Sequence, residues 1–235
     1  MSNIQLGIYK LTYEDLHNLN KLANIYANYQ ANYYWSDDFS ALYYITQAKA
    51  GFIAVSDTIA NQELLLPDIQ YSYALLDFND LHIPKRVSKL IKNKNLSIVI
   101  DDNFEEIQEY IDIYHKNNWL SHKYVSILRQ TQKFQNSNFK AITVYIEYQN
   151  EIIAGEIGYI IGATYTSLSG FSDKKYKGFG TAQLILLAQK LQKNGFEFWN
   201  LGHPYMDYKQ NLGTKIYQRD KFLKRWYKAI HKNII

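Results

Sequence analysis

Residues 165–222 read YTSLSGFSDKKYKGFGTAQLILLAQKLQKNGFEFWNLGHPYMDYKQNLGTKIYQRDKF, and the fold is decided in this stretch. It begins with an alternating strand and continues with a glycine loop. An apolar helix is predicted from Thr181 to about Asn194, and Gly195 suits its C-terminal end. Residues 196–201 are typical of a short buried strand. A strand, helix and strand in this order predict neighbouring strands in one sheet, with a site at the strand ends.

The glycine loop that opens this helix is a candidate anion site. Glycines let a backbone approach a ligand closely, and the free N–H groups of a helix N-terminus attract phosphate. The candidate residues are Lys177, Gly178, Gly180 and Thr181. Two glycines spaced by one residue also occur in ordinary turns, so both interpretations stay open.

Composition limits the class of protein. The chain has 235 residues, of which 47% are hydrophobic, which is enough for a sizeable core. It contains no cysteine, so disulfides and thiolate nucleophiles are excluded. The formal net charge is only +4. No signal peptide or apolar run long enough for a membrane span is apparent, so we expect a cytoplasmic protein. We also expect it to be a monomer.

Upstream of this stretch, helices and strands alternate. Helices are predicted over 12–30, 37–50, 81–95, 102–116 and 122–132. Strands are predicted over 52–55, 69–76, 97–100, 139–148, 152–161 and 163–169. Ser36 is a plausible cap for the helix at 37–50. No repeat or long linker separates the segments, so we expect the two halves of the chain to pack together.

Basic residues gather without acidic partners between Asp80 and Asp101. They are Lys85, Arg86, Lys89, Lys92 and Lys94. Several share one face of the predicted helix, which suits either a solvated surface or contact with nucleic-acid phosphates. The C-terminal tail is basic as well, and the same two interpretations apply to it.

The order of strand, glycine loop, helix and strand is also found in the acyltransferase fold called GNAT. Three further segments, NYYWS, LHIPKR and FEFWNLGHPYMDYKQNLGTKIYQRDKF, resemble leucyl/phenylalanyl-tRNA–protein transferases, in particular a divergent branch. The resemblance covers about Tyr33 to Leu223. It implies an α/β GNAT-like fold with a mixed, largely antiparallel sheet flanked by helices. A smaller N-terminal α/β portion is expected over 1–95 and the transferase domain over 96–235.

The resemblance also implies a reaction. An acceptor amine would attack the ester that joins an amino acid to tRNA, so the expected partners are aminoacyl-tRNA and a protein or peptide with a free amine. Residues 85–94 would contact the tRNA, and neither cofactor nor metal is expected. The expected substrate-binding residues, each of which could instead belong to the core, are Trp35, Leu168, Ser169, Gly170, Phe171, Trp199, Gly202 and Lys209.

The polar residues of the family site are replaced in this chain. The family glutamate falls on Leu168, and its aspartate and glutamine fall on Asn200 and Gly202. Asn200 can orient an amine but is no general base. The substitutes considered for the base are His203, Asp207 and Glu156, and the predicted catalytic set is Asn200, His203 and Asp207.

Two other functions fit the same residues. An acetyl-CoA-dependent N-acetyltransferase would use the glycine loop for the cofactor pyrophosphate. A catalytically silent tRNA-binding relative would account for the replaced polar residues.

Overall fold

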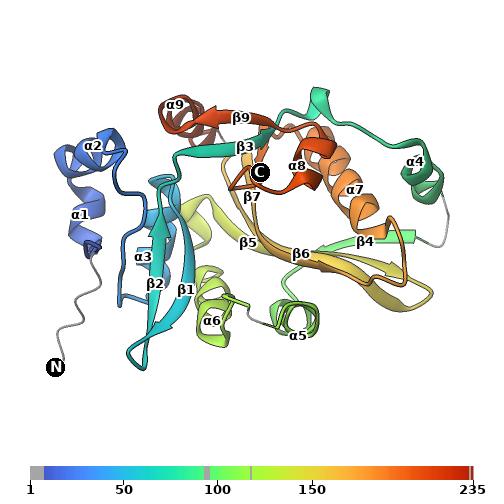
Figure 1. Ribbon diagram of the computed structural model, residues 1–235, viewed down its shortest axis with the longest axis horizontal. Helices are drawn as coiled ribbons and strands as arrows, with labels where there is room; N and C mark the ends of the chain where they lie inside the picture. Colours follow the sequence, from blue (N-terminus) through green and yellow to red (C-terminus); the bar gives the residue numbers. More distant parts are fainter. Residues whose placement is uncertain (1–7, 93–95, 117, 233, 235) are drawn as a thin grey trace.

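The protein is built on one seven-stranded sheet and a separate two-stranded hairpin (Figure 1). The computed structural model describes residues 8–92, 96–116, 118–232 and 234. The large sheet has the order β4-β5-β6-β7-β8-β3-β9, and β7–β8 is its one parallel pair. The strands are β1 (Ile53–Ile59), β2 (Gln62–Asp68), β3 (Ser72–Leu76), β4 (Leu96–Asp101), β5 (Phe139–Tyr148), β6 (Glu151–Ile161), β7 (Thr164–Ser172), β8 (Phe198–Asn200) and β9 (Lys215–Gln218).

Helices cover both faces of the large sheet. In Figure 1, α5 and α6 lie below it, whereas α7 and α8 lie above. The helices are α1 (Tyr13–His17), α2 (Leu19–Ala27), α3 (Ala41–Lys49), α4 (Lys85–Ile91), α5 (Phe104–Tyr114), α6 (His122–Thr131), α7 (Phe179–Lys193), α8 (Asp207–Leu212) and α9 (Arg219–Ile230). Short 3-10 turns occupy Phe78–Asp80 and Gln135–Ser137. In the described part of the chain, no helix combines the length and apolar character needed to cross a membrane.

The predicted α/β class is confirmed: a mixed, largely antiparallel sheet is flanked by helices. The β5–β6 hairpin matches its predicted position within one residue. Residues 141–146 of β5 are all buried, although Ala141, Thr143 and Tyr145 alternate with Ile142, Val144 and Ile146 as in a strand with one buried face. Both faces are buried because helices cover the sheet on each side.

Several boundaries differ from the prediction. The helix predicted over 12–30 is two helices, because the Asn18 side chain caps α2. Ser40 caps α3, whereas Ser36 pairs with Leu65 beside β2. Helix α8 and strand β9 follow β8, in a segment for which neither was predicted.

The predicted division at residues 95 and 96 stays a prediction. Strand β3 belongs to the N-terminal portion by sequence, yet it lies between β8 and β9 in the large sheet. Helix α9 packs next to β3, with the ring of Phe222 stacked 3.6 Å from that of Tyr73. The two portions therefore share a core.

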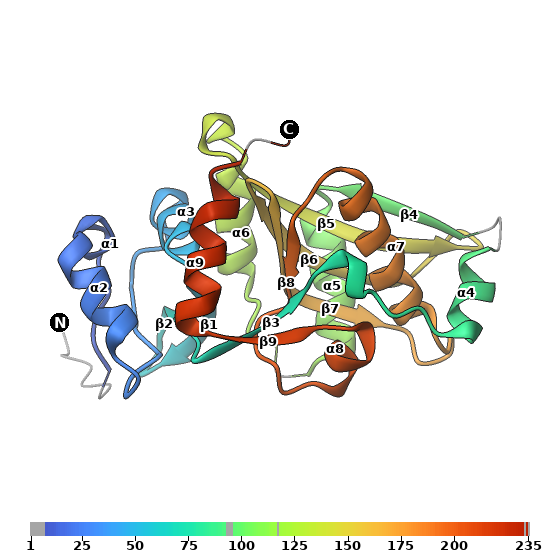
Figure 2. The ribbon, with the colours of Figure 1, turned by 90° about the horizontal axis from the view of Figure 1, so that it is seen from above.

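Arg219 links the first helices to the last one. It is fully buried at the start of α9, the helix that Figure 2 shows from above. Its guanidinium donates hydrogen bonds to backbone carbonyls before β3, at Ile69 and Gln70, and at the end of α2, including Asn28. It also lies over the rings of two tyrosines, Tyr29 and Tyr71. One basic residue of the C-terminal tail is thus structural and does not face solvent.

Replacing Arg219 should destabilise the fold. Each hydrogen bond from a charged donor is worth about 1.5–3 kcal/mol, so Arg219→Met should lower the free energy of unfolding by about 3 kcal/mol or more. Urea unfolding measures the change. Lys221→Met, at an exposed position on the same helix, is the matched control and should change little. Equal stability of the two variants would contradict this role.

Candidate active site

A cleft forms where β7 and β8 separate. The two strands pair in parallel only from Thr164 to Thr166 of β7. The chain then leaves β7, because Leu201 and Gly202 exchange backbone hydrogen bonds with Ala74 of β3. Residues 167–172 of β7 keep β6 on one side and have no described strand on the other. One edge of β7 is therefore open to a ligand.

The resulting cleft has a volume of about 600 Å³. Its walls come from β6, β7, the start of α7, the loop after α5 and helix α8. The lining residues are His115, Asn118, Trp119, Gly155, Glu156, Ser167, Leu168, Ser169, Gly170, Phe171, Ser172, Gly178, Gly180, Thr181, Gln183, Leu184, Leu201, Met206, Tyr208 and Lys209. Polar groups of several elements thus meet an apolar wall, as is usual for small-molecule sites.

An irregularity in β7 lies in the middle of the cleft. Ile157 of β6 pairs with Ser169, but the next residue, Gly158, pairs with Ser167. Leu168 is therefore an extra residue in β7. Bulges of this kind bend a strand and change the direction of its side chains, and they are common beside active sites.

Glu156 of β6 supplies a buried carboxylate to the cleft. It is 4% exposed, and its Oε1 accepts hydrogen bonds from Tyr165 (2.6 Å) and Ser167 (2.8 Å). The Ser167 hydroxyl also accepts a hydrogen bond from Nε1 of Trp199, at 2.8 Å. Burial raises the pKa of Glu156, and the hydroxyl donors and Gln183 partly oppose this. A raised pKa makes a carboxylate a better proton acceptor near neutral pH.

Gln183 adds a second buried polar group beside Glu156. Gln183 is 3% exposed and lines the cleft. Although its amide favours the ionised form of Glu156, its Nε2 has no hydrogen-bonding partner of good geometry among the described residues. Buried polar atoms usually have a hydrogen-bonding partner, and the Nε2 of Gln183, unpaired within the described part of the chain, is a candidate donor to a ligand.

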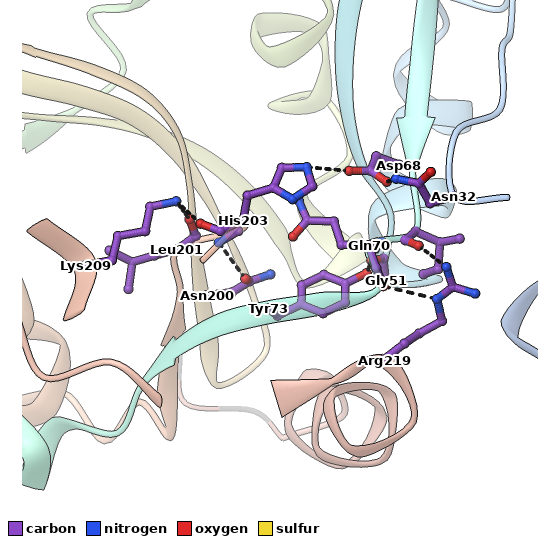
Figure 3. Close-up of polar contacts among 12 residues, drawn as sticks. Asn32, Gly51, Asp68, Gln70, Tyr73, Asn200, Leu201, His203, Lys209 and Arg219 are labelled. Carbon is purple, nitrogen blue, oxygen red and sulfur yellow. Dashed lines mark hydrogen bonds and ion pairs between the residues drawn. The ribbon is translucent and has the colours of Figure 1, made fainter. Parts of the chain in front are cut away.

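Lys209 of α8 brings a positive charge to the cleft. It is buried, and its Nζ donates to the carbonyls of Leu201 (2.5 Å) and His203 (2.6 Å), as Figure 3 shows. Burial lowers the pKa of the amine to about 8. Burial and, secondly, the charge of Glu156 raise the pKa of the adjacent Tyr208. Helix α8 and strand β6 therefore face the same space.

The predicted anion loop lies at the entrance to α7. Gly178 has φ of 92°, a conformation that favours glycine, and Gly180 and Thr181 follow it along the cleft wall. Gly180 packs closely on Ser172, where an added Cβ would lie 2.8 Å from Oγ. Lys177 is exposed and does not line the cleft. The glycines are needed for the chain path, and the anion site at the helix start stays a prediction.

The three predicted catalytic residues lie outside the cleft lining. Asn200 is buried, and its Oδ1 accepts a hydrogen bond from the backbone of Gly202. The ring of His203 points toward Asp68, with Nε2 2.8 Å from the carboxylate, and away from Lys209 (Figure 3). Asp207 is exposed at the start of α8. Their catalytic role stays a prediction.

The predicted substrate-binding residues divide into two groups. The cleft brings together Leu168, Ser169, Gly170, Phe171 and Lys209. The other three are not among its lining residues. Trp35 lies beside β2, Trp199 is buried behind Ser167, and Gly202 pairs with Ala74.

The predicted tRNA-binding helix is α4, and both views place it beside α7 (Figures 1 and 2). Lys85, Arg86, Lys89 and Lys92 are exposed, and none has an acidic partner within 4 Å among the described residues. Val87 and Leu90 face Gly178, so the helix packs against the loop that opens α7. Lys94 lies outside the described residues.

Several cleft residues were not predicted from the sequence. His115 Nε2 donates to the carbonyl of Gly170 at 2.8 Å, and Trp119 lies in the same loop. Tyr208 comes from α8, and Met206 immediately precedes that helix. The sequence signals that could have found them are the NNWL segment at 117–120 for Trp119 and the DYK segment at 207–209 for Tyr208. No three His, Asp or Glu side chains of the described residues gather closely enough to hold a metal ion.

Comparison with protein families gives a match over most of the chain. The model of the family described as leucyl/phenylalanyl-tRNA protein transferase matches residues 75–227, which is more than half of the chain. The matched segment runs from β3 into α9 and includes every residue that lines the cleft. A search of curated proteins finds no match.

Solved structures with similarity to this chain include three of low sequence identity. The C-terminal domain of a protein assigned as a lysylphosphatidylglycerol synthetase from Agrobacterium fabrum has 13% identity and a TM-score of 0.44, over 78% of this chain and 54% of that one. L-PGS from Bacillus licheniformis has 13% identity and a TM-score of 0.43, over 83% and 51%. FemX has 9% identity and a TM-score of 0.49, over 88% and 76%. The chain spans about half the length of the first two.

Glu156 should lower stability at neutral pH. Its pKa is raised in the fold, so the folded state holds the proton more tightly, and stability falls as pH rises from the unfolded pKa through the folded one. Glu156→Gln should therefore melt at a higher temperature than the unmodified protein at pH 7–8. The difference should shrink as pH falls to about 4, near the unfolded pKa. Thermal melts across pH measure this, with Glu147→Gln, at an exposed position in β5, as the control. A lower melting temperature for Glu156→Gln at pH 7 would contradict it.

Proposed function

Because this chain belongs to the leucyl/phenylalanyl-tRNA protein transferase family, we propose that it moves a leucyl- or phenylalanyl-type residue from tRNA to the N-terminal amine of a protein or peptide. The coarser activity follows from the family: the chain is a tRNA-dependent aminoacyltransferase. The donor residue and the acceptor are the proposed part.

The observation that carries the proposal is the cleft beside β7, where a buried carboxylate lies next to an apolar wall. Leu168, Phe171, Leu184 and Met206 line this space and suit an apolar amino-acid side chain. The open edge of β7 can hydrogen-bond an extended acceptor chain, as sheet edges do in peptide recognition. Both reactants of an aminoacyl transfer thus have a surface in one cleft.

The reaction needs little beyond positioning and proton transfer. The acceptor amine attacks the ester carbonyl, a C–N bond forms, and the amine proton passes to Glu156. The bond between the carbonyl carbon and the ribose oxygen then breaks, and that oxygen takes the proton from Glu156. The ester is already activated, so holding the two groups together supplies much of the rate. Glu156 of the neighbouring strand takes over the task of the family glutamate, which Leu168 replaces.

The tRNA would approach along α4. This helix carries three exposed cations, Lys92 follows its last residue, and the helix packs against the loop that opens α7. The start of α7 lines the cleft through Gly180 and Thr181, so phosphates near the 3′ end have a suitable helix N-terminus. Because charged tRNA is the donor, the proposal implies a cytoplasmic enzyme. We propose that it acts as a monomer and without a cofactor.

An acetyl-CoA-dependent N-acetyltransferase is the second candidate. The specific observation in its favour is the same helix N-terminus, since α7 follows Gly178 and lines the cleft. The exposed cations of α4 favour tRNA as the donor, because a coenzyme would not need so long a basic surface.

The transfer reaction tests the proposal directly. Purified protein is mixed with radiolabelled aminoacyl-tRNAs and a peptide with an N-terminal Arg or Lys, and with labelled acetyl-CoA in parallel. Label should pass from leucyl- or phenylalanyl-tRNA to the peptide. Glu156→Gln should lower kcat by about 10²–10⁴-fold, the usual contribution of a general base, and leave tRNA affinity unchanged. Transfer from acetyl-CoA alone would contradict the proposal, as would tRNA binding without any product.

Salt dependence tests the role of α4. Replacing Lys85, Arg86 and Lys89 together with alanine should weaken tRNA binding and reduce the slope of log K against log salt by about 1 for each phosphate that is no longer neutralised. Filter binding at several salt concentrations measures this slope. Lys133→Ala with Lys140→Ala, both at exposed positions outside α4, is the control. An unchanged slope in the triple variant would remove α4 from the interface.

A further inference from the structure

Lys209 is a buried cation without an acidic partner. It is 5% exposed, and no ion pair among the described residues includes it. It is also the one lysine or arginine among the described residues that line the cleft. An ammonium group has three N–H donors, and the carbonyls of Leu201 and His203 accept two of them. The third donor remains for a ligand.

The surroundings of Lys209 hold its amine in a fixed position. Both carbonyls belong to the segment that follows β8, where the chain turns away from β7. Backbone acceptors move little, so they orient the third N–H without any rearrangement. Burying an ammonium without an opposite charge is unfavourable. The same low-dielectric surroundings strengthen its attraction to negative charge that develops in the cleft.

We propose that Lys209 is a catalytic residue whose Nζ donates to the carbonyl oxygen of the aminoacyl ester and stabilises the oxyanion that forms there. This inference rests on the proposed function and adds an electrophilic group to it. When the amine attacks, the C–N bond forms and the carbonyl π electrons move to the oxygen, next to the ammonium. When the intermediate collapses, the C=O bond returns and the ester C–O bond breaks. Lys209 stays protonated throughout, and the proton released by the amine goes to Glu156.

The opposite role, in which neutral Lys209 removes a proton, predicts the reverse dependence on pH. An oxyanion donor must be charged, so the rate should fall as pH rises through the pKa of Lys209, which is about 8. A base must be neutral, so its rate would rise over the same range. Other titratable groups that line this cleft are His115, Glu156 and Tyr208, and Asp207 precedes Tyr208 on α8. Because each of these groups can affect the dependence of the rate on pH, only the alkaline decline that is lost when Lys209 is replaced is assigned to Lys209.

The test measures single-turnover transfer from charged tRNA between pH 6 and 10 for the full chain, Lys209→Met, Lys209→Arg and the control Lys190→Met, at an exposed position on α7. Lys209→Met keeps the buried stem and removes the charge. It should lose about 10²–10³-fold in rate, the usual effect of removing one oxyanion donor, with unchanged tRNA affinity. Its rate should also lack the alkaline decline, and Lys209→Arg should move that decline to higher pH.

The outcomes separate the two proposals. Transfer by Lys209→Met within about threefold of the unmodified rate would overturn the role of Lys209 and leave the transferase function standing. A rate that rises through pH 8 only when Lys209 is present would make it a base and also overturn the proposal. Absence of transfer by the unmodified protein, from every charged tRNA, would contradict the function itself and this inference with it. Thermal melts and tRNA binding establish that each variant is folded.

Discussion

The arrangement of this protein depends on the short parallel contact between β7 and β8. Three residue pairs hold the strands together, and β3 then draws the chain away from β7 through its bonds to Leu201 and Gly202. Because β7 continues alone, its free edge, the start of α7 and the short helix α8 enclose one cleft. A longer β8 would close this space and pair the edge that a substrate can use.

The cleft is lined by two buried side chains of opposite charge, Glu156 and Lys209. Glu156 is held by hydroxyl donors, and Lys209 is held by backbone carbonyls, so neither neutralises the other through an ion pair within the described residues. Burial moves both pKa values toward neutrality, the first upward and the second downward. Groups displaced in this way suit proton transfer and oxyanion binding near neutral pH, and they reduce the stability of the fold.

Local patterns in the sequence predicted the main strands and helices well and the residues of the site only in part. The β5–β6 hairpin and α7 could be predicted from alternation and apolar runs, because both depend on local spacing. The bulge at Leu168 depends on pairing between strands, which no local pattern contains. Position in a family motif favoured Asn200, and the acid–base chemistry of histidine favoured His203, yet tertiary packing turns them toward Gly202 and Asp68. Glu156 was predicted only as a substitute for the general base. The alternation of residues along β6 indicates which of them share a face of the sheet, but it does not indicate that this face borders a cleft.

The most direct test of this account is a structure of the protein with a stable analogue of the donor, adenosine whose 3′ position carries phenylalanine through an amide in place of the ester. The account predicts the phenylalanyl ring against Leu168 and Leu184, and the amide oxygen within hydrogen-bonding distance of Lys209 Nζ. An analogue bound elsewhere, with this cleft empty, would contradict it.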